Sequence, residues 1–150
     1  MRDLNDVDFV TDAFDCIPGS LADNFLFRHV HPSGPPGKTL MQLIDPSTRL
    51  RIDVFRAFGD TMRRTSKLDL PVGPIQLISV EDLTARAARL AFDVVGGVPT
   101  ASKYARDFLR LTDLVSPSQV EAAWQNQRKA TQPATFPRGE RTASTFDSQE

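Results

Sequence analysis

Asp6 and Asp8, near the start of the chain, have the residue type and spacing of metal-binding carboxylates. They lie in NDVDFV (5–10), which alternates as a strand does, with Val7 and Phe9 on the opposite side. Strand residues at i and i+2 project from one face with Cα atoms about 6.5–7 Å apart, so both carboxylates can reach one metal ion or a close pair. Carboxylates together with substrate phosphates bind Mg²⁺. The spacing therefore indicates a divalent-metal site, and a solvated face of an edge strand is the alternative.

A third acid, Asp53, lies inside the strand-like segment LRIDVF (50–55) between apolar neighbours. Asp is disfavoured in strands, so its position there calls for a reason. If segments 5–10 and 50–55 are neighbouring strands, three carboxylates converge on one face. Acids in such a cluster repel one another and resist ionisation, and a divalent cation relieves that repulsion. An ion pair of Asp53 with Arg51 or Arg49 is the alternative explanation.

Composition excludes several other classes of protein. The chain has 150 residues, 25% of them charged, with a net charge of -1, so it is not a strongly basic protein that binds nucleic acid by bulk charge. Its single cysteine, Cys16, excludes an intramolecular disulfide framework and a Cys-rich zinc site. The charged start MRDLNDVD is not a signal peptide, and no apolar run approaches the roughly 20 residues of a membrane helix. We therefore expect a cytoplasmic protein.

The elements that must position the acids fall into a strand-rich part and a helical part. Strands are expected at 5–10, 39–45, 50–55 and 74–80, with a short helix at 21–27, and helices at 80–94, 104–115 and 117–129. We expect an α+β domain over 1–129, a small mixed β-sheet (about 5–80) followed by a C-terminal helical group (about 80–129). Residues 130–150 are rich in Thr, Ser, Pro, Gln and charge, which predicts a disordered tail.

The order of these segments resembles a known family. NDVDFV is followed, with 45 positions between Asp8 and Asp53, by LRIDVF, and then by PIQLISVEDLTARAARL (74–90) and KYARDFLRL (103–111). Together they resemble the nucleotidyltransferase superfamily with the polymerase-beta-like core, including bacterial nucleotidyltransferase-like proteins of the abortive-infection toxin type. The likeness covers about residues 3–128, and it implies that the small mixed sheet is of the nucleotidyltransferase type.

The resemblance also implies roles for the three acids. Asp6 and Asp8 would bind the divalent ions, Mg²⁺ or Mn²⁺, that hold a nucleoside triphosphate (NTP). Asp53 would complete the catalytic metal site and help to activate the hydroxyl of the acceptor, in the manner of two-metal catalysis. Arg51 shares the face of Asp53 and is a candidate phosphate ligand, with a plain ion pair as the alternative. Lys103 is a second candidate nucleotide ligand, and a helix-surface pair with Asp107 is its alternative.

The family also places an N-terminal helix and a Gly-Ser turn before the acidic strand, whereas only residues 1–5 precede Asp6 here and Gly19-Ser20 comes later. That departure favours a chain that does not transfer nucleotides, whereas the resemblance as a whole implies a metal-dependent nucleotidyltransferase that moves a nucleoside monophosphate from an NTP to a hydroxyl acceptor. The acceptor would be a protein, an RNA or a small molecule, and an antitoxin or other protein would be a partner. The alternative is a truncated or degenerate, non-catalytic nucleotidyltransferase-like binding module.

The remaining reactive residues carry weaker signals. His29 and His31 project to one side of an extended segment, which suggests a metal pair, and a polar loop rim is the simpler interpretation. Cys16 has no obvious catalytic partner and is expected to be a small buried residue. Arg63 and Arg64 follow an expected turn and are interpreted as a solvated end.

Overall fold

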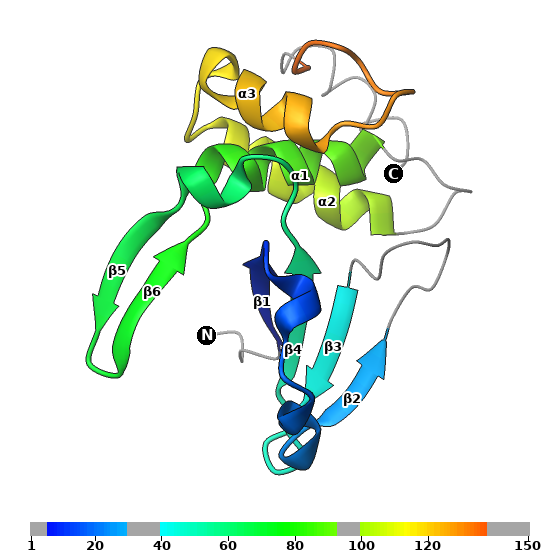
Figure 1. The fold of residues 1–150 in the computed structure, drawn as a ribbon. Helices are drawn as coiled ribbons and strands as arrows, with labels where there is room; N and C mark the ends of the chain where they lie inside the picture. Colours follow the sequence, from blue (N-terminus) through cyan, green and yellow to red (C-terminus); the bar gives the residue numbers. More distant parts are fainter. Residues whose placement is uncertain (1–5, 30–39, 93–99, 138–150) are drawn as a thin grey trace. The chain divides into compact units, whose positions relative to one another are not determined.

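A computed structural model describes residues 6–29, 40–92 and 100–137 (Figure 1). The described chain contains two small sheets and three α-helices, which confirms the α+β class. It divides into two compact units, Met1–Ala57 and Phe58–Glu150, which are treated separately below. No helix among the described residues is long and apolar enough to cross a membrane.

The first unit is a four-stranded mixed sheet. Strands β1 and β4 pair in parallel, whereas β3 is antiparallel to both β4 and β2, giving the order β1-β4-β3-β2. The strands are β1 (Asp6–Thr11), β2 (Leu26–His29), β3 (Leu40–Ile44) and β4 (Arg51–Arg56). Three of the four occupy segments in which alternation predicts strands. The parallel β1–β4 pair brings together the two segments that contain the acids.

One face of this sheet is apolar and covered. Two short 3-10 helices, η1 (Phe14–Cys16) and η2 (Gly19–Asp23), connect β1 to β2. The buried core contains Phe14, Met41, Leu43 and Val54, with Ile17, Leu21, Phe25 and Ile52 packed against it. Because side chains alternate along a strand, covering this face leaves the residues between them, including Asp53, on the other face.

Two expectations for the segment between β1 and β3 are wrong. Residues 21–27 do not form one helix, because η2 ends at Asp23 and β2 begins at Leu26. Pairing of β2 with β3 imposes the extended conformation, which is a tertiary effect that local sequence does not encode. Cys16 is exposed rather than buried.

The turn between β3 and β4 is fixed by the side chain of Asp45. Its Oδ1 accepts hydrogen bonds from the Ser47 backbone N–H at 2.8 Å and the Ser47 hydroxyl at 2.7 Å, and Oδ2 accepts one from Thr48 at 2.7 Å. These bonds to the charged form lower the pKa of Asp45 to about 2. Arg49 completes the turn with a φ of 62°. The turn thereby sets the register in which β3 and β4 pair.

The second unit contains a hairpin and three helices. The hairpin is formed by β5 (Ser66–Leu70) and β6 (Gly73–Leu77), preceded by the 3-10 helix η3 (Thr61–Arg64). The helices are α1 (Val80–Phe92), α2 (Thr100–Thr112) and α3 (Pro117–Gln127), and β5 lies in a segment for which no strand is predicted. At the start of α3, the Ser116 backbone N–H donates to Gln119 Oε1 at 2.8 Å, which is the reciprocal half of a capping box.

The helical core extends past the end of α3. Phe108 and Trp124 are fully buried, and Phe136 is 4% exposed in the same cluster. The Trp124 indole N–H donates to the Pro133 carbonyl oxygen at 2.9 Å. Packing therefore continues through Phe136, inside the segment that composition assigns to the tail, and residues 138–150 lie outside the described part of the chain.

Candidate active site

The pairing of β1 with β4 places the acids side by side. In this parallel register Asp8 lies opposite Asp53, and Asp6 lies opposite Arg51. Residues paired across neighbouring strands share a face, and Asp6 and Asp8 are two apart, so all four side chains belong to one face. This is the convergence that the alternating sequences predict if the two strands are neighbours. The sheet therefore gathers the three acids and one arginine on the face opposite its apolar core.

Arg51 links two of the acids. Its Nη2 donates to Asp6 Oδ2 at 2.6 Å, and its Nε lies 3.4 Å from Asp53 Oδ1. The side chains of Arg51 and Asp6 are 45% and 46% exposed, whereas that of Asp53 is 11% exposed. The ion pair that the sequence offered as an alternative for Asp53 is thus present, although its longer distance makes it the weaker of the two contacts.

Gln42 is a member of this cluster that sequence reasoning missed. It lies opposite Asp53 on β3, and its Nε2 donates to Asp53 Oδ1 at 2.9 Å. The available signal was a polar residue in the middle of the otherwise apolar strand LMQLI. Gln42 and Arg51 both approach Oδ1 of Asp53, so this almost fully buried carboxylate is fixed in orientation.

The arrangement combines accessible acids with a resident cation. Asp6 and Asp8 are exposed, so an ion or a phosphorylated molecule can reach them from solvent. Within the described ranges, no group of three His, Cys, Asp or Glu residues is arranged to hold a metal ion. Oxygen ligands from Asp6, Asp8 and Asp53 are nevertheless the type that Mg²⁺ and Mn²⁺ prefer, so the donor set fits a hard divalent cation.

The side chains of the other predicted ligands lie outside the described residues. Lys103 lies in α2, in the second unit, and its side chain is outside the described residues. His29 ends β2, but neither its side chain nor any part of His31 is described. The roles of Lys103 and of the histidine pair therefore stay predictions.

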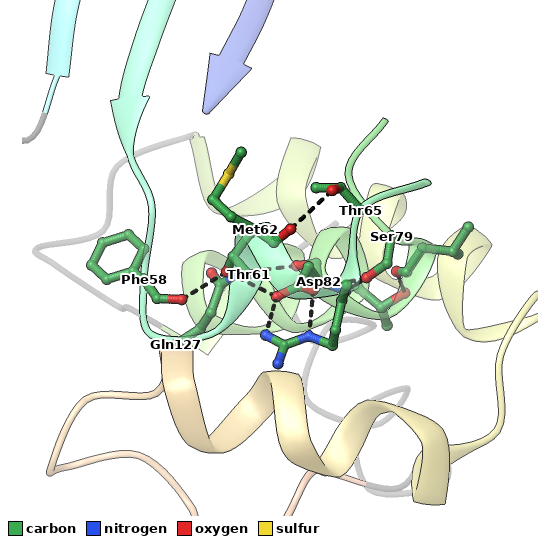
Figure 2. Close-up of polar contacts among 10 residues, drawn as sticks. Phe58, Thr61, Met62, Thr65, Ser79, Asp82 and Gln127 are labelled. Carbon is green, nitrogen blue, oxygen red and sulfur yellow. Dashed lines mark hydrogen bonds and ion pairs between the residues drawn. The ribbon is translucent and has the colours of Figure 1, made fainter. Parts of the chain in front are cut away.

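A second polar cluster surrounds Asp82 at the start of α1 (Figure 2). Arg64 donates twice to this carboxylate, from Nε to Oδ2 at 2.7 Å and from Nη2 to Oδ1 at 2.8 Å. The Ser79 hydroxyl donates to Oδ2 at 2.8 Å, and Thr61 Oγ1 lies 3.0 Å from Oδ1. Asp82 is fully buried, so Arg64 is an ion-pair partner within the fold and not a solvated end, whereas Arg63 is 85% exposed.

The charge of Asp82 is already balanced by groups of the protein, which distinguishes this cluster from a ligand-binding site. Burial acts to raise the pKa of Asp82, but hydrogen bonds from Arg64, Ser79 and Thr61 outweigh it, so the pKa lies below its ordinary value. The same contact raises the pKa of Arg64. Asp82 is buried and its charge is matched by these donors, which is the property of a structural ion pair. We therefore place the candidate chemistry on the four-stranded sheet.

Comparison with known proteins adds no assignment, because neither a model of a protein family nor a curated protein sequence matches the chain.

Proposed function

We propose that the chain is a metal-dependent nucleotidyltransferase that moves a nucleoside monophosphate from an NTP to a hydroxyl acceptor. The observation that carries the proposal is the parallel register of β1 and β4, which sets Asp8 opposite Asp53 with Asp6 on the same face. This placement supports the resemblance to the nucleotidyltransferase superfamily, in which two acids on one strand and a third on another share a metal site. The mixed four-stranded sheet is then a version of the polymerase-beta-like core.

In this proposal each acid has a defined task. Asp6 and Asp8, both exposed, bind the ions that accompany the triphosphate. Asp53, held by Gln42, supplies a fixed carboxylate beside the acceptor hydroxyl. Bound divalent ions supply charge neutralisation for the attacking and leaving oxygens. The protein contributes positioning, and little covalent chemistry falls to its side chains. The acceptor is a protein, an RNA or a small molecule, and a toxin–antitoxin setting is part of the proposal by analogy alone.

A non-catalytic nucleotidyltransferase-like module is the second candidate. The observation that favours it is the ion pair of Arg51 with Asp6 and Asp53, because a guanidinium already neutralises part of the acidic cluster. Such a module would bind a nucleotide or a protein partner without transferring a nucleotidyl group. The two candidates differ in product formation, so one pair of experiments separates them.

The first experiment measures metal binding through stability. At a concentration of Mn²⁺ about 100 times its Kd, binding to the folded state stabilises it by about 2.7 kcal/mol. We expect Mn²⁺ to raise the melting temperature of the wild type, followed by far-UV circular dichroism, and not that of Asp8→Ala or Asp53→Ala. Asp23→Ala is the matched control, because Asp23 is an exposed acid in η2. Equal shifts in all four proteins would exclude the site.

The second experiment measures transfer. The wild type, incubated with Mg²⁺ or Mn²⁺ and each of four α-labelled NTPs, is expected to label itself, an added RNA or a protein fraction. Asp53→Ala should abolish this labelling, and Asp23→Ala should retain it. Mn²⁺ binding that depends on Asp8 and Asp53, without labelling of any acceptor, would favour the non-catalytic module over the enzyme.

A further inference from the structure

We propose that Arg51 is an exchangeable internal counter-ion: it occupies the acidic cluster when metal is absent and is released to the nucleotide phosphates when metal binds. The inference rests on the proposed function and assigns a regulatory and positioning role to a residue of the same site. It starts from the observation that a guanidinium bridges two of the three acids that would hold the metal.

The contacts of Arg51 show what it replaces. One nitrogen, Nη2, is 2.6 Å from Asp6 on β1, and another, Nε, is 3.4 Å from Asp53 on its own strand. A single positive group therefore serves two carboxylates from neighbouring strands, which is also what a bridging cation does. Because neighbouring carboxylates repel one another, Arg51 offsets part of that repulsion while no metal ion is bound.

The same contacts show that Arg51 can leave. Its side chain and that of Asp6 are almost half exposed, and ion pairs of this kind contribute little to stability because water solvates both groups. A divalent cation coordinated by Asp6 and Asp53 would lie close to the guanidinium and repel it. Metal and the paired form of Arg51 are therefore competing occupants of one position.

A released Arg51 has a suitable second partner. A guanidinium presents a planar fork of donors that matches phosphate oxygens, and Arg binds phosphate in a bidentate manner more readily than Lys does. Arg51 lies on the same face as the acids, so the metal that displaces it also brings a triphosphate within the reach of its side chain. The exchange thus couples metal binding to nucleotide binding.

Arg56 provides a matched control on the same strand. Its Nη2 donates to Asp15 Oδ1 at 2.7 Å, and its guanidinium lies 4.9 Å from the centre of the Phe14 ring. Positions 51 and 56 have opposite parity along β4, so Arg56 belongs to the covered face. Arg51→Gln and Arg56→Gln remove the same charge from the same strand, and only the first touches the acidic face.

The test measures Mn²⁺ and ATP binding separately on the full chain. Free Mn²⁺ is followed by electron paramagnetic resonance in the wild type, Arg51→Gln, Arg51→Lys and Arg56→Gln. We expect Arg51→Gln to bind Mn²⁺ about two- to fivefold more tightly, which is the range set by the loss of one exposed ion pair. Arg51→Lys retains the competing charge and should stay near the wild type, as should Arg56→Gln. ATP binding in saturating Mn²⁺ should weaken in Arg51→Gln.

Opposite changes in the two affinities distinguish this exchange from a structural role, which would weaken both. Unchanged or weaker Mn²⁺ binding by Arg51→Gln, with binding still abolished by Asp8→Ala, would overturn the exchange and leave the proposed function standing. Equal tightening in Arg56→Gln would also overturn it, because bulk charge would then be the cause. If Asp8→Ala left Mn²⁺ binding unchanged, or if none of the proteins bound Mn²⁺, both the proposed function and the exchange would be excluded.

Discussion

The two units of the molecule each contain an arginine–aspartate pair, and the two pairs have almost the same length. Arg51 and Asp6 are 2.6 Å apart in the sheet unit, and Arg64 and Asp82 are 2.7 Å apart in the helical unit. Their surroundings differ, because Asp6 is 46% exposed whereas Asp82 is completely buried. Distance alone would make these pairs equivalent, and burial makes them different in kind.

The difference follows from what each carboxylate loses if its partner leaves. Asp82 has no access to water, so removing Arg64 would strand a buried charge. Asp6 keeps water within reach, so removing Arg51 exposes it to solvent at little cost. The buried pair is therefore fixed as part of the scaffold, and the exposed pair is free to exchange its partner. Three predictions sharpen this comparison, in order of decreasing effect.

The largest effect is expected from Asp82→Ala. Removing Asp82 breaks the buried pair and takes the acceptor from the Ser79 and Thr61 hydroxyls, and we expect a loss of about 3 kcal/mol in the free energy of unfolding, at the low end for such pairs because the Arg64 side chain left behind is 24% exposed. Urea unfolding followed by the fluorescence of Trp124, the single tryptophan of the chain and fully buried in the same unit, measures this loss. The control Asp60→Ala removes the 3.6 Å pair with Arg63, whose side chain is 85% exposed, and should stay within about 0.5 kcal/mol. A loss below about 1 kcal/mol for Asp82→Ala would contradict the scaffold role.

A smaller loss of stability is expected at low pH, where protonation of Asp82 weakens the same ion pair. The pKa of Asp82 is lower in the folded chain than its ordinary value of 3.8, so its contribution to stability is complete above that value. The contribution declines as the pH falls through the folded pKa, since the protonated acid no longer pairs with Arg64. Urea midpoints of the wild type should fall as the pH is lowered below the ordinary value of 3.8, and those of Asp82→Asn should fall less steeply. Parallel pH profiles of the two proteins would show that another group is responsible.

The smallest effect is expected from Asp6→Asn, which breaks the exposed pair. Because such pairs contribute about 0–1 kcal/mol, the free energy of unfolding of the sheet unit should change by no more than that. Trp124 lies in the second unit, so its fluorescence does not report on the sheet of the first unit. Hydrogen-exchange mass spectrometry of peptides from β1 and β4 measures the stability of that sheet directly. Loss of protection throughout β4 would mean that the pair is part of the scaffold after all, and the contrast between the two units would disappear.

The local sequence predicts the elements that have a strong period of their own. Alternation in 5–10 and 50–55 identifies β1 and β4, and the apolar stripe after Ser79 identifies α1. It does not predict β2 or β5, which are short and owe their extended form to pairing with β3 and β6. In β5 the polar Lys67 and Asp69 do alternate with Leu68 and Leu70, but the run is only five residues long, and β2 (LFRH) shows no alternation.

The candidate site shows the same limit. Spacing predicts that Asp6 and Asp8 share a face and that Asp53 belongs with them if the strands are neighbours. It does not predict that Gln42 binds Asp53, because that contact depends on the register of β3 with β4. Nor does it separate the two arginines, since Arg64 appears in sequence as one of two adjacent cations, and only the fold brings Asp82 against it. Residue type and period are local, whereas partner choice is decided by the fold.

The parallel pairing of β1 also has a consequence for how the chain is made. Asp6 and Arg51 are 45 positions apart, and β1 pairs within its sheet only with β4. At a synthesis rate of about 5–20 residues per second, β1 waits for several seconds as an unpaired strand before its partner emerges. An unpaired strand edge is a template for aggregation, and charged side chains along it oppose that association. We therefore expect the charges of Asp6 and Asp8 to oppose association of the nascent chain during that interval.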